Sequence, residues 1–407
     1  MNDIIIITVD CWRHDAISKM PKVLDSLEDF QKSKAVCHSP YTAGVFPTLL
    51  ASNHAWEAFE DGELSDSTFS LPGKLSKLGY STGGFVAGNP FLNAWADEFD
   101  TFWNAGYFTG RVKSNKVKKT VEYLYRLLFQ RQEVPAEKVF RKANNWWTNQ
   151  TSPTFTWIHL MEPHSPYHPG LRRARDIGLV GSYYANLDYK FTEYQTAQSL
   201  TKFTQRRVEQ LYWECIELLD DKISTFVDKI PENATVLLLG DHGEEFDHGV
   251  YGHARLYDET VLVPFLSRWT LSERDFGEPL RQLDLAPTIV NGLDSSLPES
   301  WSGKSYSSDF TPAYMWSAPD VGGYIYAGIR TDQFKIIRTF DRDMEPLDLE
   351  IYDIKSDPNE SDDISQSNPR QSLVNALDNW ASEEHNVDFI SKKNDYVQDR
   401  LEALGYK

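Results

Sequence analysis

The fold is decided by the stretch Leu237-Leu238-Leu239-Gly240-Asp241-His242-Gly243-Glu244-Glu245. Its apolar half, preceded by Thr235-Val236, predicts a short buried strand that ends at a glycine. Asp241 and His242 then lie at the carboxyl end of this strand, where open α/β sheets place their ligand crevice. A carboxylate beside an imidazole suits Zn, Mn or Fe, so the stretch predicts a metal site. The alternative is that Asp241 caps the next turn and His242 lies on the surface.

A second strand end of the same character lies far away in the sequence. The β-branched run Ile4-Ile5-Ile6-Ile7-Thr8-Val9 predicts a central parallel strand that is buried on both faces. Asp10 follows directly, at the carboxyl end of this strand. Considered alone, Asp10 could equally be a helix N-cap. Two acidic strand ends in one parallel sheet meet at one edge, so we expect Asp10, Asp241 and His242 to converge on one cation.

Thr42 is the residue that we expect to act as the nucleophile. The turn Pro40-Tyr41-Thr42 opens a predicted helix, where backbone N–H groups and the helix dipole favour an anion. Coordination to a metal lowers the pKa of a hydroxyl enough for it to attack phosphorus. Without the metal residues, an N-cap would be the better interpretation of Thr42.

Histidines in two loops complete the predicted site. The predicted strand 154–160 leads into a loop that three prolines make rigid. His164 in this loop is placed to donate a hydrogen bond to a phosphoryl oxygen or to act as a general acid. His253, in the Gly-rich and His-rich loop 246–253, is expected to contact the substrate or its leaving group. His159, inside the strand, is predicted to be a core residue.

The remaining pattern predicts an α/β protein with a large, mostly parallel central sheet flanked by helices and a smaller C-terminal α+β subdomain. We expect further strands at 35–38, 80–86 and 261–266, and helices at 20–30, 71–78, 207–227 and 283–290. A helical stripe over 117–128 predicts a packing helix, and the weakly periodic residues 170–205 suggest a lid or insertion. Beyond residue 305 we expect short antiparallel strands at 323–329, 334–339 and 350–354, then helices at 373–384 and 395–404. We therefore place a catalytic domain at 1–304 and a smaller domain at 305–407.

The bulk composition restricts the partners and the location that we expect. The 407 residues carry a net charge of −19 without a basic stripe to neutralise phosphates, so nucleic acid is not an expected partner. The three cysteines, Cys11, Cys37 and Cys215, have no paired spacing, so neither a disulfide framework nor a zinc cluster follows from them. Such usage favours a cytoplasmic protein. We find neither a signal-peptide pattern nor an apolar run of about 20 residues, so no membrane span is expected.

Taken together, these motifs resemble the alkaline phosphatase superfamily, in its sulfatase and phosphonate monoester hydrolase branch. The resemblance runs over nearly the whole chain. It rests on segments that follow one another in the family's order: Val9–Asp15, Thr42–Ser52, Gly79–Asn89, Glu162–Tyr167, Gly240–Glu244, Leu283–Val290, and the C-terminal Arg330-Thr331, Lys335, Tyr352–Ile354 and Asp357-Pro358. Each motif alone has moderate specificity, but their joint order is strong. The resemblance implies that Asp10 is a metal ligand.

Four departures from the sulfatase pattern bear on the reaction. Sulfatases need a Cys or Ser that is oxidised to formylglycine, whereas this chain has Thr42 in that position. The Arg that organises the aldehyde hydrate is replaced by Phe46, and the second Asp of the opening motif by Cys11. The expected Lys is missing, with His253 in roughly its place. The residues that remain resemble the single-metal site of the phosphonate monoester and phosphodiester hydrolases: Asp10, Thr42, Asp241 and His242.

The predicted function is therefore a metal-dependent hydrolase of phosphate or phosphonate mono- and diesters. Its cofactor would be one divalent ion, Mn, Zn, Fe or Ca, and its catalytic residues would be Thr42, His164 and His253. Asn89 and Arg13 would bind the substrate, a small anionic ester such as one on a glycan or a lipid head group, and the chain could form a homo-oligomer. The alternatives are a sulfuric ester hydrolase, a phosphoglycerol- or phosphoethanolamine-type transferase, and a non-catalytic member of the fold that binds an anion.

Overall fold

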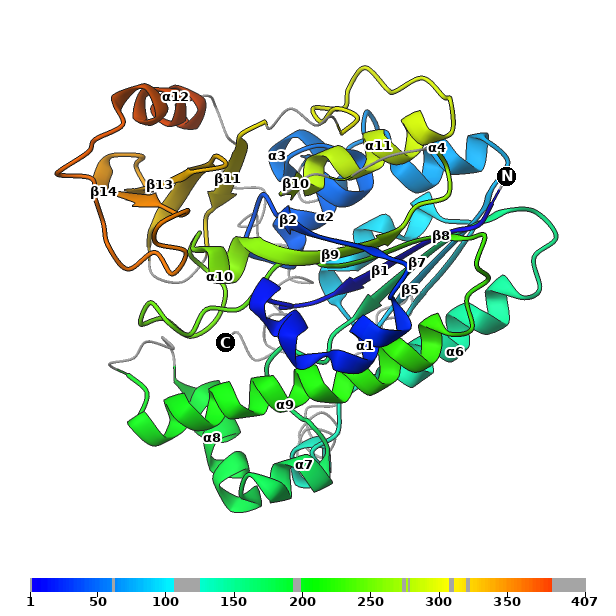
Figure 1. Ribbon diagram of the computed structural model, residues 1–407, viewed down its shortest axis with the longest axis horizontal. Coiled ribbons are helices and arrows are strands. Elements are labelled where there is room, and N and C mark those ends of the chain that lie inside the picture. The colour runs from blue at the N-terminus through cyan, green and yellow to red at the C-terminus, as the bar shows by residue number, and fades with distance from the viewer. Residues whose placement is uncertain are drawn as a thin grey trace.

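A computed structural model gives the arrangement of the chain in space (Figure 1). It describes residues 2–60, 63–105, 125–192, 199–272, 276, 279–306, 311–319 and 323–382. The central sheet has eight strands in the order β10-β2-β9-β8-β1-β7-β5-β6. In that order their bounds are Leu280–Arg281, Gln31–Val36, Leu262–Arg268, Thr235–Gly240, Ile4–Val9, Thr154–Leu160, Ser81–Val86 and Thr101–Asn104. The predicted large α/β sheet is confirmed.

The middle of the central sheet is parallel, and its register aligns the strand ends that carry polar residues. β1 lies between β7 and β8, and its last residue, Val9, pairs with Leu160 on one side and Gly240 on the other. β9 runs antiparallel to both β8 and β2, so the sheet is mostly but not wholly parallel. Because the three central strands end in register, the residues that follow β1 and β8 leave the sheet side by side.

The side chains of β1 alternate between two layers of core. Ile5 and Ile7 pack in the layer that contains α9 (Lys202–Val227), whereas Ile4 and Ile6 pack in the layer that contains α2 (Thr42–Ala51). Figure 1 shows two groups of helices on opposite faces of the sheet: α1 (Pro21–Ser26), α6 (Ala136–Trp147) and α9 on one, and α2, α4 (Leu71–Lys77) and α11 (Leu285–Gly292) on the other. A strand that is apolar at every position needs cover on both faces, and β1 has it.

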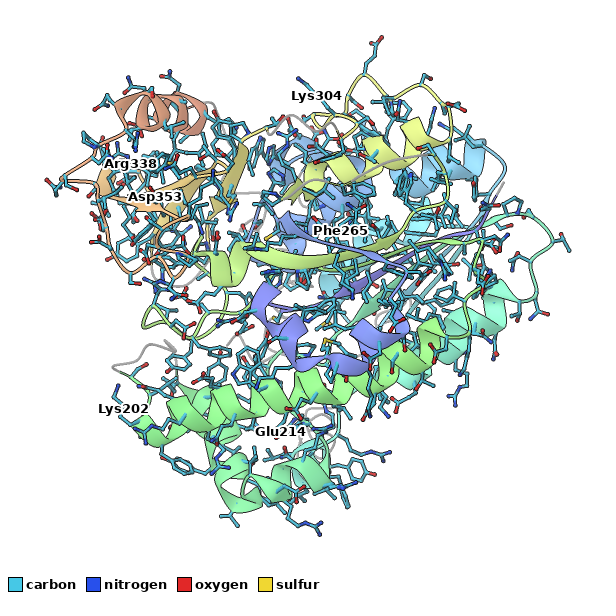
Figure 2. All side chains as sticks on the ribbon, viewed as in Figure 1. Lys202, Glu214, Phe265, Lys304, Arg338 and Asp353 are labelled. Atoms are coloured by element: carbon cyan, nitrogen blue, oxygen red, sulfur yellow. The ribbon has the colours of Figure 1, made fainter. Side chains whose placement is uncertain are left out.

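A second, smaller sheet forms the C-terminal part of the chain. Its antiparallel order is β11-β12-β13-β14, with bounds Ala313–Ser317, Ile325–Arg330, Phe334–Phe340 and Pro346–Asp353. α12 (Gln371–Ala381) packs on it through Val374 and Leu377. In Figure 2, Arg338 and Asp353 mark this sheet, apart from Phe265 on β9. The smaller C-terminal α+β part is confirmed, while a domain boundary at residue 304 stays a prediction.

Several elements differ from the predicted ones. The helix expected at 20–30 is the shorter α1, and the strand after it begins at Gln31 instead of Ala35. Residues 170–205, for which the sequence predicts a lid or insertion, contain α7 (Leu171–Asp176) and α8 (Leu179–Phe191), and α8 packs against α9. The helix predicted at 395–404 and residues 117–124 of the predicted helical stripe lie outside the described residues.

The helix α9 crosses one face of the molecule and is marked by Lys202 and Glu214 in Figure 2. Its buried positions include Leu211, Cys215 and Leu219, which follow one another at a helical spacing of four. The helix begins at Lys202, five residues before the predicted start. Within the described ranges, no helix combines the length and the apolar character needed to cross a bilayer.

Candidate functional site

Two acidic residues leave the central sheet at adjacent strand ends. Asp10 follows β1, and its backbone N–H donates to the carbonyl of Leu160 on β7 at 2.9 Å. Asp241 follows β8, and its N–H donates to the carbonyl of Val9 at 3.1 Å. Both side chains are 0% exposed. The hydrogen bonds of the sheet therefore fix two carboxylates next to each other in the interior.

The N-terminus of α2 places a hydroxyl between these carboxylates. Oγ1 of Thr42 lies 3.3 Å from Oδ2 of Asp10, 3.3 Å from Oδ2 of Asp241 and 3.4 Å from Nε2 of His242. We name these four residues the strand-edge cluster. The N-cap of α2 is Tyr41, and Thr42 is its first helical residue, so the alternative that Thr42 is the N-cap is wrong.

His242 presents a lone pair to the strand-edge cluster. Its Nδ1 lies 2.9 Å from the carbonyl oxygen of Gly243, so Nδ1 carries the proton and Nε2 is an acceptor. Nε2 lies 3.5 Å from Oδ1 of Asp10 and 3.7 Å from Oδ2 of Asp241. Carboxylate oxygens and an unprotonated imidazole nitrogen are all acceptors, so they repel one another unless a proton or a cation lies among them.

The spacing of these atoms fits a metal ion. Ligand atoms held at about 2.1 Å by a tetrahedral ion lie roughly 3.4 Å from one another. The separations in the strand-edge cluster run from 3.3 to 3.7 Å. Asp10, Asp241 and His242 offer ligand atoms that all lie within 4.8 Å of one another. The four predicted ligands are brought together, and their two carboxylates, imidazole and hydroxyl are donors that suit Mn, Zn or Fe.

The charges of the strand-edge cluster are unbalanced. Burial and the charge of Asp10 raise the pKa of Asp241 well above its ordinary value. Burial also acts to raise the pKa of Asp10, but the surrounding imidazoles, His164 foremost, hold it well below its ordinary value. Burial and the neighbouring His253 lower the pKa of His242 to about 3, so this ring is neutral at pH 7. The ion pairs that Asp10 and Asp241 form within the described part of the chain involve histidines and no Lys or Arg.

Asn89 directs a donor at the proposed nucleophile. It is the N-cap of η2 (Pro90–Glu98), where its Oδ1 accepts the N–H of Phe91 at 3.1 Å. Its Nδ2 therefore faces the cluster, 3.4 Å from Oδ2 of Asp10 and 3.5 Å from Oγ1 of Thr42. A fixed donor beside a nucleophile is what binding of a developing oxyanion requires.

His164 and His253 lie on the more exposed side of the cluster. Their ring centroids are 5.6 Å apart, and the ring of His253 is 4.7 Å from that of His242. The side chain of His253 is 13% exposed, whereas those of Asp241 and His242 are 0% exposed. A substrate would therefore reach the strand-edge cluster past these two histidines.

Two residues that the sequence prediction did not include also belong to this region. His159, predicted as core, is buried as expected, yet its Nε2 lies 3.5 Å from Oδ2 of Asp10. Oε2 of Glu244 lies 3.2 Å from Nδ1 of His253, and Oε1 of Glu244 accepts a hydrogen bond from the hydroxyl of Tyr167 at 3.0 Å. A signal for His159 existed, because it comes one residue before the end of β7 and therefore near the same edge as Asp10.

Arg13, predicted to bind substrate, is engaged elsewhere. Its guanidinium forms ion pairs with Asp15, Asp247 and Glu259 at 2.9 to 3.0 Å. The guanidinium also lies over the ring of Trp213 at 5.7 Å from its centroid. These contacts indicate that Arg13 holds neighbouring loops together, and they lend no support to a role in substrate binding.

One glycine lets the loop that follows the predicted ligands Asp241 and His242 pack tightly. A Cβ on Gly243 would overlap the carbonyl oxygen of Glu259. The N–H of Gly243 donates to the carbonyl of Thr260 at 2.7 Å, and that of Glu244 to the carbonyl of Glu259 at 3.1 Å. Only glycine allows this approach, which holds the segment after His242 against α10 (Asp258–Val261).

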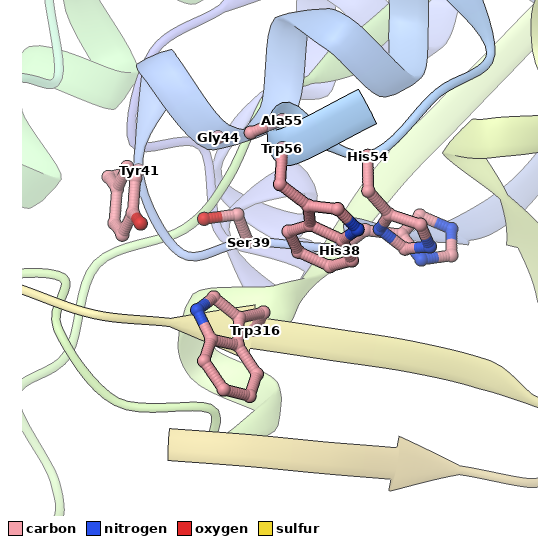
Figure 3. A pocket seen from close by; sticks show the side chains of 8 residues that line it. All are labelled: His38, Ser39, Tyr41, Gly44, His54, Ala55, Trp56 and Trp316. Carbon is pink, nitrogen blue, oxygen red and sulfur yellow. The ribbon is translucent and has the colours of Figure 1, made fainter. Parts of the chain in front are cut away.

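A small pocket lies beside the N-terminus of α2 (Figure 3). It holds about 10 Å³, which is room for roughly one water molecule. Among the described residues, Nε2 of His38 and Oγ of Ser39 have no hydrogen-bond partner, although both are buried. The pocket is too small for an ester substrate. It is lined by His38, Ser39, Tyr41, Gly44, His54, Ala55, Trp56 and Trp316.

Comparison with protein families identifies the class. The sulfatase model matches residues 15–295, which is more than half of the chain, so the chain belongs to the sulfatase family. A model of the C-terminal part of N-sulphoglucosamine sulphohydrolase matches residues 246–386. These matches confirm the resemblance drawn from the sequence motifs. No curated protein matches the chain.

Solved structures share the fold over almost the whole length. A putative sulfatase from Bacteroides thetaiotaomicron has a TM-score of 0.68 at 14% identity, covering 98% of this chain and 94% of that one. A protein in complex with its substrate D-glucosamine-2-N,6-O-disulfate has a TM-score of 0.66 at 13% identity, covering 99% and 98%. The phosphonate monoester hydrolase of Agrobacterium radiobacter has a TM-score of 0.64 at 14% identity, covering 94% and 95%. At these identities the likeness shows the fold alone.

Proposed function

We propose that this chain hydrolyses phosphate or phosphonate esters, with Thr42 as the nucleophile and a divalent metal ion as cofactor. The proposal is carried by the position of Oγ1 of Thr42, which lies 3.3 Å from a carboxylate oxygen of Asp10 and of Asp241. The lone pair of His242 lies 3.4 Å from the same oxygen. The hydroxyl thus sits at the centre of the acceptors that would hold the ion.

The reaction follows from this placement. A divalent ion, which Asp10, Asp241 and His242 would hold, would supply positive charge that lowers the pKa of the Thr42 hydroxyl and neutralises charge on a phosphoryl oxygen. Thr42 loses its proton toward the adjacent carboxylates and attacks phosphorus in line, so that the Oγ1–P bond forms while the bond to the leaving oxygen breaks. Water then attacks phosphorus, the Oγ1–P bond breaks, the phosphate or phosphonate product leaves, and a proton returns to Oγ1.

The surrounding donors would bind the other oxygens of the ester. Asn89 directs Nδ2 toward Thr42 from 3.5 Å and would stabilise negative charge that develops on a phosphoryl oxygen. His164 would donate to a second oxygen. His253, whose Nδ1 lies 3.2 Å from Oε2 of Glu244, would lie near the leaving group and supply its proton from Nε2.

Phe46 supports a hydroxyl nucleophile in place of an aldehyde hydrate. Its side chain is 0% exposed, and its ring packs edge-on against His159 with centroids 5.1 Å apart. An apolar ring here offers no donor to a hydrate, so α2 carries Thr42 beside the proposed metal ligands but lacks the Arg that formylglycine chemistry uses.

Three substitutions at one position test the nucleophile. Thr42→Val keeps the shape of the side chain without the hydroxyl, and Thr42→Ala removes both, so each should abolish turnover of an aryl phosphodiester. Thr42→Ser retains a hydroxyl and should keep measurable turnover. Metal content, measured on the same samples, should stay largely intact in all three. Unchanged turnover in Thr42→Val would overturn the assignment of Thr42.

A sulfuric ester is the second candidate substrate. The family match and the sulfated sugar bound by one solved neighbour favour it, and they make a glycan a plausible carrier of the ester. An aryl sulfate assayed beside an aryl phosphodiester separates the two reactions. Turnover of the sulfate alone would replace the phosphate proposal, and binding without turnover of either ester would indicate a non-catalytic anion-binding protein.

A further inference from the structure

A second group of metal-ligating side chains adjoins the strand-edge cluster. Sγ of Cys11 lies 3.8 Å from Nδ1 of His253, and this nitrogen lies 3.2 Å from Oε2 of Glu244. The thiol of Cys11 also donates to Oδ1 of Asp10 at 3.1 Å. With His164 beside them, these residues form what we name the Cys11 cluster. Thiolate, imidazole and carboxylate are the three ligand types that zinc takes in proteins.

The separations in the Cys11 cluster match those between ligands of one ion. At ordinary Zn–S and Zn–N lengths, S and N ligands of a tetrahedral zinc lie roughly 3.6 Å apart, and O and N ligands roughly 3.4 Å. The observed separations are 3.8 and 3.2 Å. Cys11 also belongs to two sets whose ligand atoms lie within 4.8 Å of one another, one with His242 and His253, the other with Asp10 and His164, and each of these sets shares one residue with the strand-edge cluster.

The backbone is held in a conformation that turns the thiol into this cluster. Cys11 has a φ of 56°, in the left-handed region that non-glycine residues adopt at a cost. The hydroxyl of Tyr212 donates to the carbonyl of Cys11 at 2.9 Å and accepts the N–H of Arg13 at 3.2 Å, which fixes the turn. Sγ consequently lies between Oδ1 of Asp10, at 3.1 Å, and the ring of His253.

The charge of the region also calls for more than one cation. Asp10, Asp241 and Glu244 are buried carboxylates, so one divalent ion leaves a net negative charge that repels an anionic ester. A second divalent ion together with a Cys11 thiolate brings the sum to zero. An ion pair between a protonated His253 and Glu244 would balance the charge equally well. An experiment must therefore distinguish this ion pair from a second bound cation.

We infer that Cys11, Glu244 and His253, with His164 beside them, bind a second, thiophilic divalent cation such as Zn²⁺ next to the strand-edge cluster. On binding, the Sγ–H bond is replaced by an Sγ–metal bond, and the thiol proton passes to solvent. The inference concerns the metal content of the protein. It would stand even if Thr42 were not the nucleophile.

The experiment counts ions and looks for the thiolate directly. Metal-free full-length protein is titrated with Zn²⁺ alone, for stoichiometry, and with Co²⁺ alone, for absorption. We expect two ions per chain and a thiolate-to-cobalt charge-transfer band in the near ultraviolet. Cys11→Ser should bind one ion and lose the band. Cys215→Ser, which alters a buried thiol on α9, is the matched control and should keep both.

The other outcomes are equally decisive. One ion per chain without the band in the wild-type protein overturns the inference and assigns His253 to an ion pair with Glu244. Two ions without the band overturn the role of Cys11. If Cys11→Ser does not fold, the test uses the charge-transfer band of the wild-type protein and of Glu244→Gln. A band in the wild-type protein that weakens in Glu244→Gln supports the inference. Thr42→Val should retain the band. Turnover therefore tests the nucleophile and the band tests the second ion, so either proposal can fail without the other.

Discussion

Two buried groups of carboxylates in this molecule differ in how their charge is balanced. In the strand-edge cluster, Asp10 and Asp241 face each other, a hydroxyl and a neutral imidazole. In the other group, Asp258 pairs with Arg330 at 2.8 Å and with Lys335 at 2.9 Å. Lys335 also pairs with Glu360 at 2.8 Å, and we name these four residues the junction cluster because it joins α10 to the small sheet.

The difference separates a structural ion-pair network from the proposed ligand site. Burial acts to raise the pKa of Asp258, but the cations Lys335 and Arg330 hold it below its ordinary value, so Asp258 is stable as an anion. At Asp241 burial and a second carboxylate act together and raise the pKa. A buried charge is tolerated only when it is compensated. The junction cluster compensates its charges with Lys and Arg, whereas among the described residues Asp10 and Asp241 form ion pairs only with histidines, which is why we propose a bound cation there.

The largest effect is expected for Asp241→Asn. Mutation of a residue that only orients a metal ligand typically weakens metal affinity by roughly 10- to 100-fold. Loss of the proposed ligand Asp241 itself should weaken the affinity by at least this factor, and turnover should fall with it. The metal-free variant should nevertheless melt at a higher temperature than metal-free wild type, because an amide removes the repulsion between acceptors. Thermal melting of both proteins with and without metal measures the two effects.

The same chemical change in the other cluster is the control. Asp258→Asn leaves Lys335 and Arg330 short of an anion and should lower the melting temperature without changing metal content. If both amide variants destabilise the metal-free protein alike, the contrast between the two clusters is wrong.

Lys335→Met should produce the next largest effect. Lys335 is 0% exposed and neutralises two carboxylates, so its removal leaves buried negative charge. Breaking such a pair costs about 3–5 kcal/mol. Urea denaturation at pH 7 should show this loss of stability, while metal stoichiometry stays at the wild-type value. A loss below about 1 kcal/mol would show that the junction cluster does not depend on its lysine.

Glu259→Gln should have an effect that depends on pH. Burial opposes ionisation of Glu259, but His248 and Arg13 lower its pKa from 4.5 to about 2. A depressed carboxyl pKa adds stability that is fully present above the unfolded pKa and is lost as the pH falls toward the folded pKa. The variant should therefore be less stable than wild type by roughly 2–3 kcal/mol near pH 6, and the difference should vanish near pH 2. A difference that does not change over this range would contradict the assignment.

The smallest effect is expected for Lys355→Ala. Lys355 pairs with Asp332 at 3.0 Å, and the two side chains are 60% and 57% exposed. Exposed pairs contribute about 0–1 kcal/mol. Urea denaturation should show a change within that range, in contrast to Lys335→Met. A larger loss would mean that exposure is a poor guide to the role of ion pairs in this small sheet.

The sequence predicts the part of the fold that apolar runs determine. β1, β7 and β8 are buried at every position, so their bounds agree with the predicted strands to within a residue. Neither α7 nor α8 is predicted. The sequence of α8 shows no apolar period, because this helix buries small or polar residues such as Ala185 and Asn186 against its neighbours.

The candidate site also contains residues that a local sequence pattern predicts and residues that only distant contacts define. The strand ends predict that Asp10, Asp241 and His242 converge, because parallel strands in one sheet end at one edge. The environment of Arg13 depends on Asp247 and Glu259, which are more than two hundred residues away. No local pattern marks such a contact. Cys11 and His253 are likewise brought together only by the path of a loop, so their spacing in sequence gives no sign of a shared ion.

The close packing at Gly243 connects the strand-edge cluster to the junction cluster through the backbone. The backbone after His242 is hydrogen-bonded to Glu259 and Thr260, the neighbours of Asp258 in α10. Asp258 in turn holds Arg330 at the end of β12 and Lys335 on β13. Whatever occupies the edge of the large sheet therefore also restrains the attachment of the small one, and slower amide hydrogen exchange in β12 would report occupancy from across the molecule.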